Sequence, residues 1–284
     1  MGAGGLLRKV VSMGGGPASL EQRAESRYRL RVGITQIILG GAILAAWQTY
    51  GIRDPLFLSY PTAIFGRLTT WVTDGSLWFH LLFTVEAMVL GFIAGSSTGI
   101  FAGFILGRNL FWADVLDVYI TSVNSLPKIA LAPLLVLWFG IGLLPKVVLA
   151  AVIVFFFVFI NTYTGVREVD PDLIDMVRLM GAGKSQTVKK VVFPHALTWI
   201  FAGLKLAAPY ALIGAVMGEI IASNRGIGYL ISGSANKFDT AGTFAGLLVL
   251  LIICSLMNMM IARLERRWTG WKKAGVEGGG AGVA

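Results

Sequence analysis

The chain's clearest chemical motif is Gly181-Ala182-Gly183-Lys184-Ser185, which matches the end of a phosphate-binding loop. Such a loop holds nucleotide phosphates with its backbone N–H groups, and its Lys and Ser contact phosphate and Mg²⁺. The motif also requires a glycine five positions before Gly183, where this chain has Arg178. No strand is predicted before it, so we expect this chain not to bind ATP.

The composition indicates a membrane protein. Of 284 residues, 56% are hydrophobic and only 14% are charged, whereas a soluble domain has about 25% charged residues. The net charge of +9 could suggest nucleic-acid binding, but the Lys and Arg residues gather between apolar segments and form no single basic face. We therefore expect a lipid bilayer, and no nucleic acid, as a partner.

Six apolar segments approach the roughly 20 residues that a helix needs to cross a bilayer. They are residues 32–50, 80–106, 114–139, 145–165, 199–222 and 243–262. The third contains Pro127, Lys128 and Pro133, so we expect a broken or kinked helix there. Residues 61–72 are typical of a short interfacial helix. The pattern predicts an all-α, polytopic membrane protein.

Basic residues are distributed unevenly among the loops, which predicts an orientation. With the N-terminus in the cytoplasm, the outer side has only Arg53, Arg67, Lys146, Arg225 and Lys237, and the other loop cations lie inside. This asymmetry follows the positive-inside rule. We predict a basic cytoplasmic segment over residues 1–31, a membrane domain over residues 32–263 and a basic, then glycine-rich, cytoplasmic tail over residues 264–284.

Ionisable residues within or beside the apolar segments must face protein or water. They are Glu86, Asp114, Asp117, Lys128, Lys205 and Glu219. Lys128, Glu219 and Arg225 are our candidates for a substrate path. For Glu219 the alternatives are pairing with Arg225, capping the glycine-rich turn at residues 226–228, and direct contact with a substrate.

Two further kinds of site are not indicated by the sequence. His80 and His195 are far apart, and no group of Cys, His and carboxylate residues has the spacing of metal ligands. No catalytic triad or carboxylate pair can be assembled, because most candidates are predicted on opposite sides of the membrane. We expect no metal site.

Residues 166–196 form a polar island between two apolar segments. Asp170 can cap a helix that begins with proline, and Gly181 can end it. Ser185 can cap a second helix, which Pro194 would close. We predict a helix, a glycine break and a helix, with an apolar face that needs a partner. That face consists of Leu173, Ile174, Val177 and Met180.

The island resembles the EAA loop of ABC-importer permeases. That pattern is Glu-Ala-Ala, three residues, Gly, nine residues, Ile-x-Leu-Pro. This chain has Asp175-Met176-Val177, three residues, Gly181, nine residues and Val191-x-Phe193-Pro194. Asp175 keeps the carboxylate, whereas Met176 and Val177 replace the alanines with bulkier side chains. The resemblance extends from about Tyr60 to Arg263 and is greatest to permeases of the nitrate, sulfonate and taurine group.

The resemblance implies a type I ABC-importer permease in a bacterial inner membrane, with both termini cytoplasmic. It implies two ATPase subunits, which bind ATP and Mg²⁺, a second permease chain, most simply an identical one, and an extracytoplasmic solute-binding protein. This chain would then bind no cofactor and would not be an enzyme. The solute would be nitrate, a sulfonate, taurine or a related organic nutrient. The coupling residues would be Asp175, Met176, Val177, Gly181, Ala182, Gly183, Lys184, Ser185 and Pro194.

Two other classes of function are alternatives. An ion- or proton-coupled secondary transporter or channel would use Lys128, Lys205 and Glu219 for coupling. Such proteins often contain internal repeats, and none is visible in this sequence. A membrane enzyme would need a catalytic cluster on one side of the bilayer, and none is found.

Glycines recur every four residues in the second apolar segment. They are Gly91, Gly95, Gly99, Gly103 and Gly107. On a helix this spacing produces a smooth stripe that another helix can approach closely. We expect the stripe to pack inside the helix bundle rather than to line a substrate path.

Overall fold

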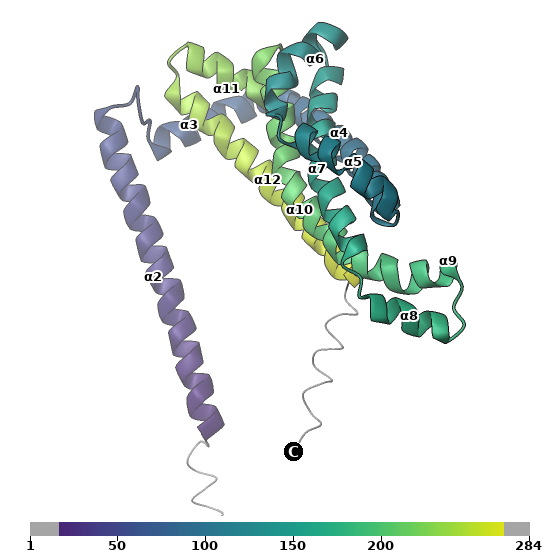
Figure 1. Cartoon of the computed structure of the whole chain (residues 1–284). Helices are drawn as coiled ribbons and strands as arrows, with labels where there is room; N and C mark the ends of the chain where they lie inside the picture. The colour runs from purple at the N-terminus through teal and green to yellow at the C-terminus, as the bar shows by residue number, and fades with distance from the viewer. Residues whose placement is uncertain (1–16, 270–284) are drawn as a thin grey trace, which may run out of the picture. The chain divides into compact units, whose positions relative to one another are not determined.

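The computed structural model describes residues 17–269, which contain helices and connecting turns and, over that range, no strand (Figure 1). The chain forms two compact units, Met1–Ala63 and Ile64–Ala284. Residues 1–16 and 270–284 lie outside the described part, and with them Arg8, Lys9, Lys272, Lys273 and the predicted glycine-rich end of the tail.

The first unit contains one long helix, α2 (Pro17–Arg53), and the turn that follows it. The stretch Arg27–Arg53 is apolar and long enough to cross a membrane, and it includes the predicted span 32–50. Gln48 fixes the turn: its amide nitrogen donates to the Thr62 hydroxyl at 2.9 Å, and its amide oxygen accepts from the Thr62 N–H at 3.2 Å.

The other helices of the described residues belong to the second unit, and α3 begins at its boundary. They are α3 (Pro61–Thr73), α4 (Ser76–Gly107), α5 (Leu110–Asn124), η1 (Lys128–Leu131), α6 (Ala132–Phe139), α7 (Leu144–Arg167), α8 (Pro171–Leu179), α9 (Lys184–Thr187), η2 (Val188–Val192), α10 (Phe193–Ile221), α11 (Ile227–Asn236) and α12 (Thr240–Thr269). Within residues 17–269, five helices can span a membrane, and a bent pair can supply a sixth span. The predicted all-α fold with about six spans is confirmed.

The bent pair is the predicted third span. Its halves, Phe111–Asn124 and Lys128–Phe139, meet at 76°, and Pro127, which has no N–H to continue a helix, lies at the break. Lys128 provides a hydrogen-bond donor to a carbonyl group at the C-terminal end of α5. Its Nζ donates to the Asn124 carbonyl at 2.7 Å and to the Asn124 side-chain oxygen at 3.0 Å. The predicted break is thus confirmed.

The core of the second unit follows α7, which packs against both α4 and α10. The α7 side chains of Leu149, Val154 and Val158 are fully buried. On the α10 side, Gly203 faces Asn161 and Gly214 faces Ala150. Because residue numbers rise on α10 as they fall on α7, these two helices are antiparallel.

The glycine stripe of α4 lies against α7. A Cβ atom at any of its five glycines would come within 2.4–2.8 Å of α7, first at Val147–Ala150 and last at Tyr163–Val166. The partners advance along α7 as the glycines advance along α4, so these two helices are parallel and in close contact. The stripe is therefore part of the helix packing.

Candidate functional site

The polar island folds into an arm, residues 170–192, in which α8 and α9 lie side by side at one end of the second unit (Figure 1). Asp170 caps α8, since its Oδ1 accepts from the Asp172 N–H at 2.9 Å. Gly181, with φ +86°, ends it. The Gly181 N–H bonds to the Arg178 carbonyl at 2.9 Å and the Ala182 N–H to the Val177 carbonyl at 3.1 Å, which is a Schellman motif. Both predicted ends of this helix are confirmed.

The second helix of the arm differs from the prediction at both ends. Ser185 does not cap it; the helix begins after Gly183, whose N–H donates to the Gln186 side-chain oxygen at 3.0 Å. Pro194 does not close it either. The chain passes from α9 through the π-helical turn η2 into α10, and the Phe193 N–H bonds to the Val188 carbonyl five residues back. The wider turn avoids the clash that a proline ring makes with the carbonyl four residues before it.

This continuity gives the arm a direct mechanical connection to the membrane. Residues Lys184–Ile221 form a single candidate span, so the second half of the arm and the long helix α10 are one body. A displacement of the arm would therefore be transmitted along α10.

The predicted apolar face of α8 is divided between two surroundings. Ile174 turns inward and packs against a cluster of buried residues that includes Val166 and Val192. Leu179 and Met180, by contrast, are 90% and 81% exposed. Leu173 and Met176 are also exposed, and Asp175 forms an exposed ion pair with Arg178 at 3.4 Å. The tip of the arm thus presents apolar side chains that nothing in the described chain covers.

A basic pocket of about 360 Å³ lies where the arm meets the membrane helices. Its cations come from α7, α8, α9 and the residue after α4. They are Arg108, Arg167, Arg178 and Lys184. Four cations of the second unit therefore gather at the arm end.

At the opposite end of α7 and α10, three side chains hold the start of α11. His80 Nδ1 accepts from the Gly226 N–H at 3.0 Å, and Thr84 Oγ1 accepts from the Ile227 N–H at 2.8 Å. Glu219 accepts from the Gly228 N–H at 2.8 Å. We call His80, Thr84 and Glu219 the α11 clasp. It satisfies N–H groups that the first turn of a helix would otherwise leave unpaired.

Glu219 is the buried centre of this clasp. Its side chain is 1% exposed, and both carboxylate oxygens accept from the Thr84 hydroxyl, at 2.9 and 3.0 Å. A Cβ atom at Gly226, where φ is +110°, would lie 2.1 Å from the Glu219 carboxyl carbon. Of the alternatives for Glu219, the geometry is that of a cap on the glycine-rich turn. The Arg225 guanidinium instead lies over the Phe83 ring, 4.9 Å from its centroid.

Lys146 was not singled out by the sequence reasoning, which placed it among the outer-loop cations. It lies in the first turn of α7 and is only 5% exposed. Its Nζ donates to the Ser223 hydroxyl at 2.6 Å, and the Glu219 carboxylate is close enough to interact with its charge. The available signal was its position, directly before a long apolar run.

Of the three predicted substrate-path residues, Glu219 and Arg225 lie at the same end of the second unit, near the end of α10 and in the turn before α11, and Lys128 is not beside them. Arg225 lines a pocket with Lys146. Lys128 is not among the residues that line this pocket; its ammonium lies 4.6 Å from the centroid of the Phe156 ring. Lys205 forms an ion pair with Glu265 of α12.

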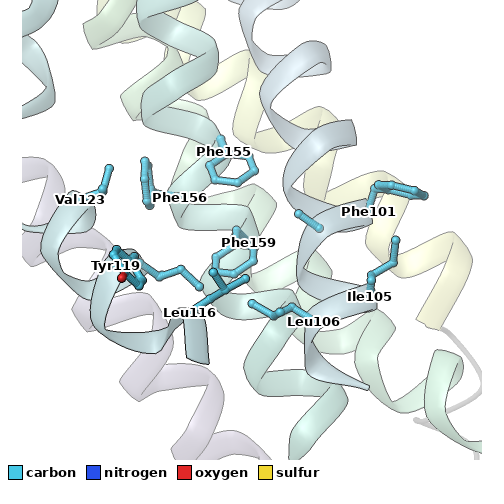
Figure 2. Close-up of a pocket in the computed structure, with 11 residues that line it drawn as sticks. Phe101, Ile105, Leu106, Leu116, Tyr119, Val123, Phe155, Phe156 and Phe159 are labelled. Atoms are coloured by element: carbon cyan, nitrogen blue, oxygen red, sulfur yellow. The ribbon is translucent and has the colours of Figure 1, made fainter. Parts of the chain in front are cut away.

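An apolar groove of about 480 Å³ lies among α4, α5 and α7 (Figure 2). Phe101, Phe155 and Phe159 are among its lining residues, and Tyr119 supplies the one hydroxyl among the lining side chains. Such walls offer nothing to orient a charged solute, so this groove is not a candidate solute site.

Replacing Gly181 with valine should weaken the arm. A β-branched residue at φ +86° costs about 1–2 kcal/mol and favours a different end to α8. Gly183→Ala is the matched control, because Gly183 has φ −71° and open space around its Cα. Limited proteolysis between α8 and α9 should become faster in Gly181→Val and remain unchanged in Gly183→Ala. Equal cleavage of both variants and the unchanged chain would contradict this account.

The comparisons with known proteins agree with these features. Residues 87–270 match the family model described as binding-protein-dependent transport system inner membrane component. SsuC of Bacillus subtilis, a permease named for aliphatic sulfonates, is 30% identical over 241 residues, which are 84% of this chain and 87% of that protein. The riboflavin transport system permease protein RibX of Chloroflexus aurantiacus is 32% identical over 233 residues, covering 81% and 87% of the two chains.

Among solved structures, a chain of the MetNI methionine ABC transporter in an inward-facing conformation matches with a TM-score of 0.56 and 22% identity. The match covers 70% of this chain and 97% of that one. This likeness concerns the fold, while the family match rests on the sequence. The chain therefore belongs to the binding-protein-dependent transport system inner membrane components, the permease subunits of ABC importers, which are not themselves enzymes.

Proposed function

We propose that the arm is the contact through which a separate ATPase subunit drives this permease. The observation that carries the proposal is the exposed apolar tip of α8 on an arm that continues into α10. An uncovered group of large apolar side chains marks an interaction surface. Leu179 and Met180 lie on the arm outside the membrane spans, where lipid would not cover them.

The mechanism that we propose is mechanical. When the ATPase subunits bind ATP and close, the docked arms move with them. Because α10 has 29 residues, it carries that displacement over about 43 Å, at 1.5 Å per residue. At its far end, Glu219 of the α11 clasp transmits the motion to α11, so access to the solute path changes from one side to the other. No bond in the permease is made or broken.

We further propose that two identical permease chains form the membrane part. Each chain has one arm, and two ATPase subunits need two arms. Glu86 supports a second chain, because it is exposed on α4 about 15 Å from the helix start, at 1.5 Å per residue. An ionisable side chain at that depth must face protein or water rather than lipid.

The proposed orientation places the arm and both termini in the cytoplasm. The basic pocket beside the arm supports this, and so does the direction of α12. The Lys205–Glu265 ion pair joins the early part of α10 to the late part of α12, so α12 ends near the arm. Arg263, Arg266 and Arg267 therefore add to the positive charge at that end.

For the solute, we propose a small organic anion or related nutrient that an extracytoplasmic binding protein delivers. The similarity to SsuC, named for sulfonates, supports an anion. The similarity to RibX, named for riboflavin, indicates that the family handles other organic solutes too. Cations at the end far from the arm, Lys146 and Arg225, favour the anion.

The deciding experiment changes the tip of the arm without disturbing the fold. Leu179→Glu should abolish co-purification of the ATPase, because a carboxylate would enter an apolar contact. We expect a loss of about 2 kcal/mol or more, roughly thirtyfold in affinity. Leu264→Glu is the control, since Leu264 is 54% exposed near the end of α12 but lies outside the arm.

Permease yield and elution profile should be the same in both variants. If the ATPase remained bound to Leu179→Glu and also to Met176→Glu, the arm would not be the coupling contact.

A further inference from the structure

A pocket of about 350 Å³ lies at the end of the second unit far from the arm. Phe83 of α4, the turn before α7 and the turn before α11 enclose it. Its lining residues are Phe83, Ile141, Gly142, Leu143, Lys146, Ser223, Asn224 and Arg225. This volume is within the range of small-molecule sites.

The charge of the lining is entirely positive. Lys146 and Arg225 contribute two cations, and none of the lining residues is acidic. Within residues 17–269, neither cation has a carboxylate oxygen within 4.0 Å. The nearby Glu219 carboxylate accepts hydrogen bonds from Thr84 and the Gly228 N–H, and it acts on Lys146 only through its charge, from beyond 4.0 Å. Two cations are thus available to a ligand from outside.

The pocket is held in shape before any ligand arrives. Ser223 accepts from Lys146 Nζ at 2.6 Å, donates to the Arg225 carbonyl at 2.6 Å and accepts from the Arg225 N–H at 3.1 Å. An ammonium group has three N–H donors, so Lys146 retains donors beyond the one that it gives to Ser223. The Arg225 guanidinium lies over the Phe83 ring, which limits its positions.

The pocket has a cationic wall and an apolar wall, and together they define the kind of ligand that fits. Two cations that line one pocket suit a group with several negative oxygens, and Arg pairs with such groups through more than one N–H. The side chains of Phe83, Ile141 and Leu143 offer an apolar surface beside them. An organic anion, with an acidic head and a small carbon chain, matches both walls better than an inorganic ion does.

We propose that this pocket receives the acidic group, a sulfonate or a carboxylate, of the transported solute at the outer mouth of the permease. The proposal rests on the function proposed above, because the pocket faces outward only if the arm is cytoplasmic. It assigns the first solute contact to Lys146 and Arg225. It also links that contact to α10 and α11, since Ser223 and Arg225 lie between those helices.

Thiol labelling in the assembled transporter tests this directly. The one cysteine, Cys254, is first replaced (Cys254→Ala), and Asn224→Cys places a reporter in the pocket. Intact cells are treated from outside with anionic sulfonatoethyl methanethiosulfonate or with its cationic trimethylammonium counterpart. For each reagent, the labelling rate of the cysteine is divided by the rate at which the same reagent reacts with a small thiol in solution, which corrects for the reagents' different intrinsic reactivities. We expect the anionic reagent to react at least about fivefold faster on this scale, because two cations concentrate anions.

Charge-removing variants show whether the preference comes from the pocket. Arg225→Gln and Lys146→Met should each reduce the ratio towards one. Lys237→Gln, which removes an exposed cation outside the lining, should leave it unchanged. If Lys146→Met does not fold, Arg225→Gln alone shows whether the preference for the anionic reagent comes from the pocket. Ethanesulfonate should slow the labelling several-fold at constant ionic strength, whereas uncharged diethyl sulfone should not.

Other results would overturn the proposal. An equal normalised rate for the two reagents, both at Asn224→Cys and at a second reporter, Ile141→Cys, would mean that the pocket does not select anions. A preference that survives Arg225→Gln would place the selecting charge elsewhere. Labelling requires neither ATP nor a docked ATPase, so a failure here is distinct from a failure of Leu179→Glu to release the ATPase. Labelling only from the cytoplasmic side would count against the orientation itself.

Discussion

Replacing Gly99 with leucine should prevent the permease from accumulating as a folded protein. The new Cβ atom would lie 2.8 Å from the Phe155 carbonyl oxygen and 3.1 Å from the Phe159 nitrogen, and backbone atoms cannot turn aside as a side chain can. Gly→Ala in a free helix stabilises by about 1 kcal/mol, but overpacking costs about 1–3 kcal/mol for small additions. Gly99→Ala should therefore be neutral or destabilising, and leucine, with three further carbons, should force α4 and α7 apart.

The measurement is the yield of monodisperse protein after mild detergent extraction. Gly66→Leu is the matched control, because Gly66 is a helical glycine of α3 with nothing within 4 Å of an added Cβ atom. Gly66→Leu should purify normally. If Gly99→Leu also purified normally and transported a different range of solutes, the stripe would be part of the solute path rather than of the helix packing.

The sequence predicted correctly those features that are determined by residues close to one another in the chain. The spans, the break at Pro127 and both ends of α8 were predicted, because apolar length, a missing N–H and a glycine at positive φ act within a few residues. The arm itself could be recognised for the same reason: its capping and glycine signals lie within one short segment. Such features need no knowledge of the neighbouring helices.

The prediction at Pro194 was wrong for a reason that is also informative. Proline ends a regular α-helix because its ring clashes with a carbonyl one turn earlier. Here η2 widens that turn, and the helix continues into α10. The cost of a π-turn is offset by packing, since Val192 and Ala196 on either side are buried. Tertiary contacts therefore decided what local propensity could not.

The α11 clasp could not be predicted, because its partners are distant in sequence. His80 and Gly226 are 146 residues apart, and Thr84 and Glu219 are 135 apart. A single sequence carries no signal that α4 and the end of α10 meet. The burial of Lys146 was missed for the same reason: Gly218, which gives its stem room, belongs to another helix.

Glu219→Gln should be among the most destabilising conservative substitutions in this chain. It leaves the buried Lys146 ammonium without the negative charge that acts on it from beyond 4.0 Å, and a buried cation that loses its compensating charge destabilises the fold. Glutamine keeps one side-chain oxygen, which can still accept from the Gly228 N–H. A loss of stability would therefore come from the missing negative charge rather than from a lost hydrogen bond to α11. The free energy of unfolding is measured on purified protein by titration with a denaturing detergent.

A second variant separates charge from capping. In Glu219→Gln combined with Lys146→Met, both charges are absent, so no buried cation is left without a compensating charge nearby. The double variant should therefore be more stable than Glu219→Gln alone. Glu265→Gln is the comparison at a partly exposed ion pair, that with Lys205, where we expect a loss of about 0–1 kcal/mol. If the double variant were no more stable than the single one, Glu219 would act through its hydrogen bonds to Thr84 and Gly228. Full stability of Glu219→Gln with an altered solute constant would instead place this carboxylate in the solute path, and α11 would then be held by His80 and Thr84 without it.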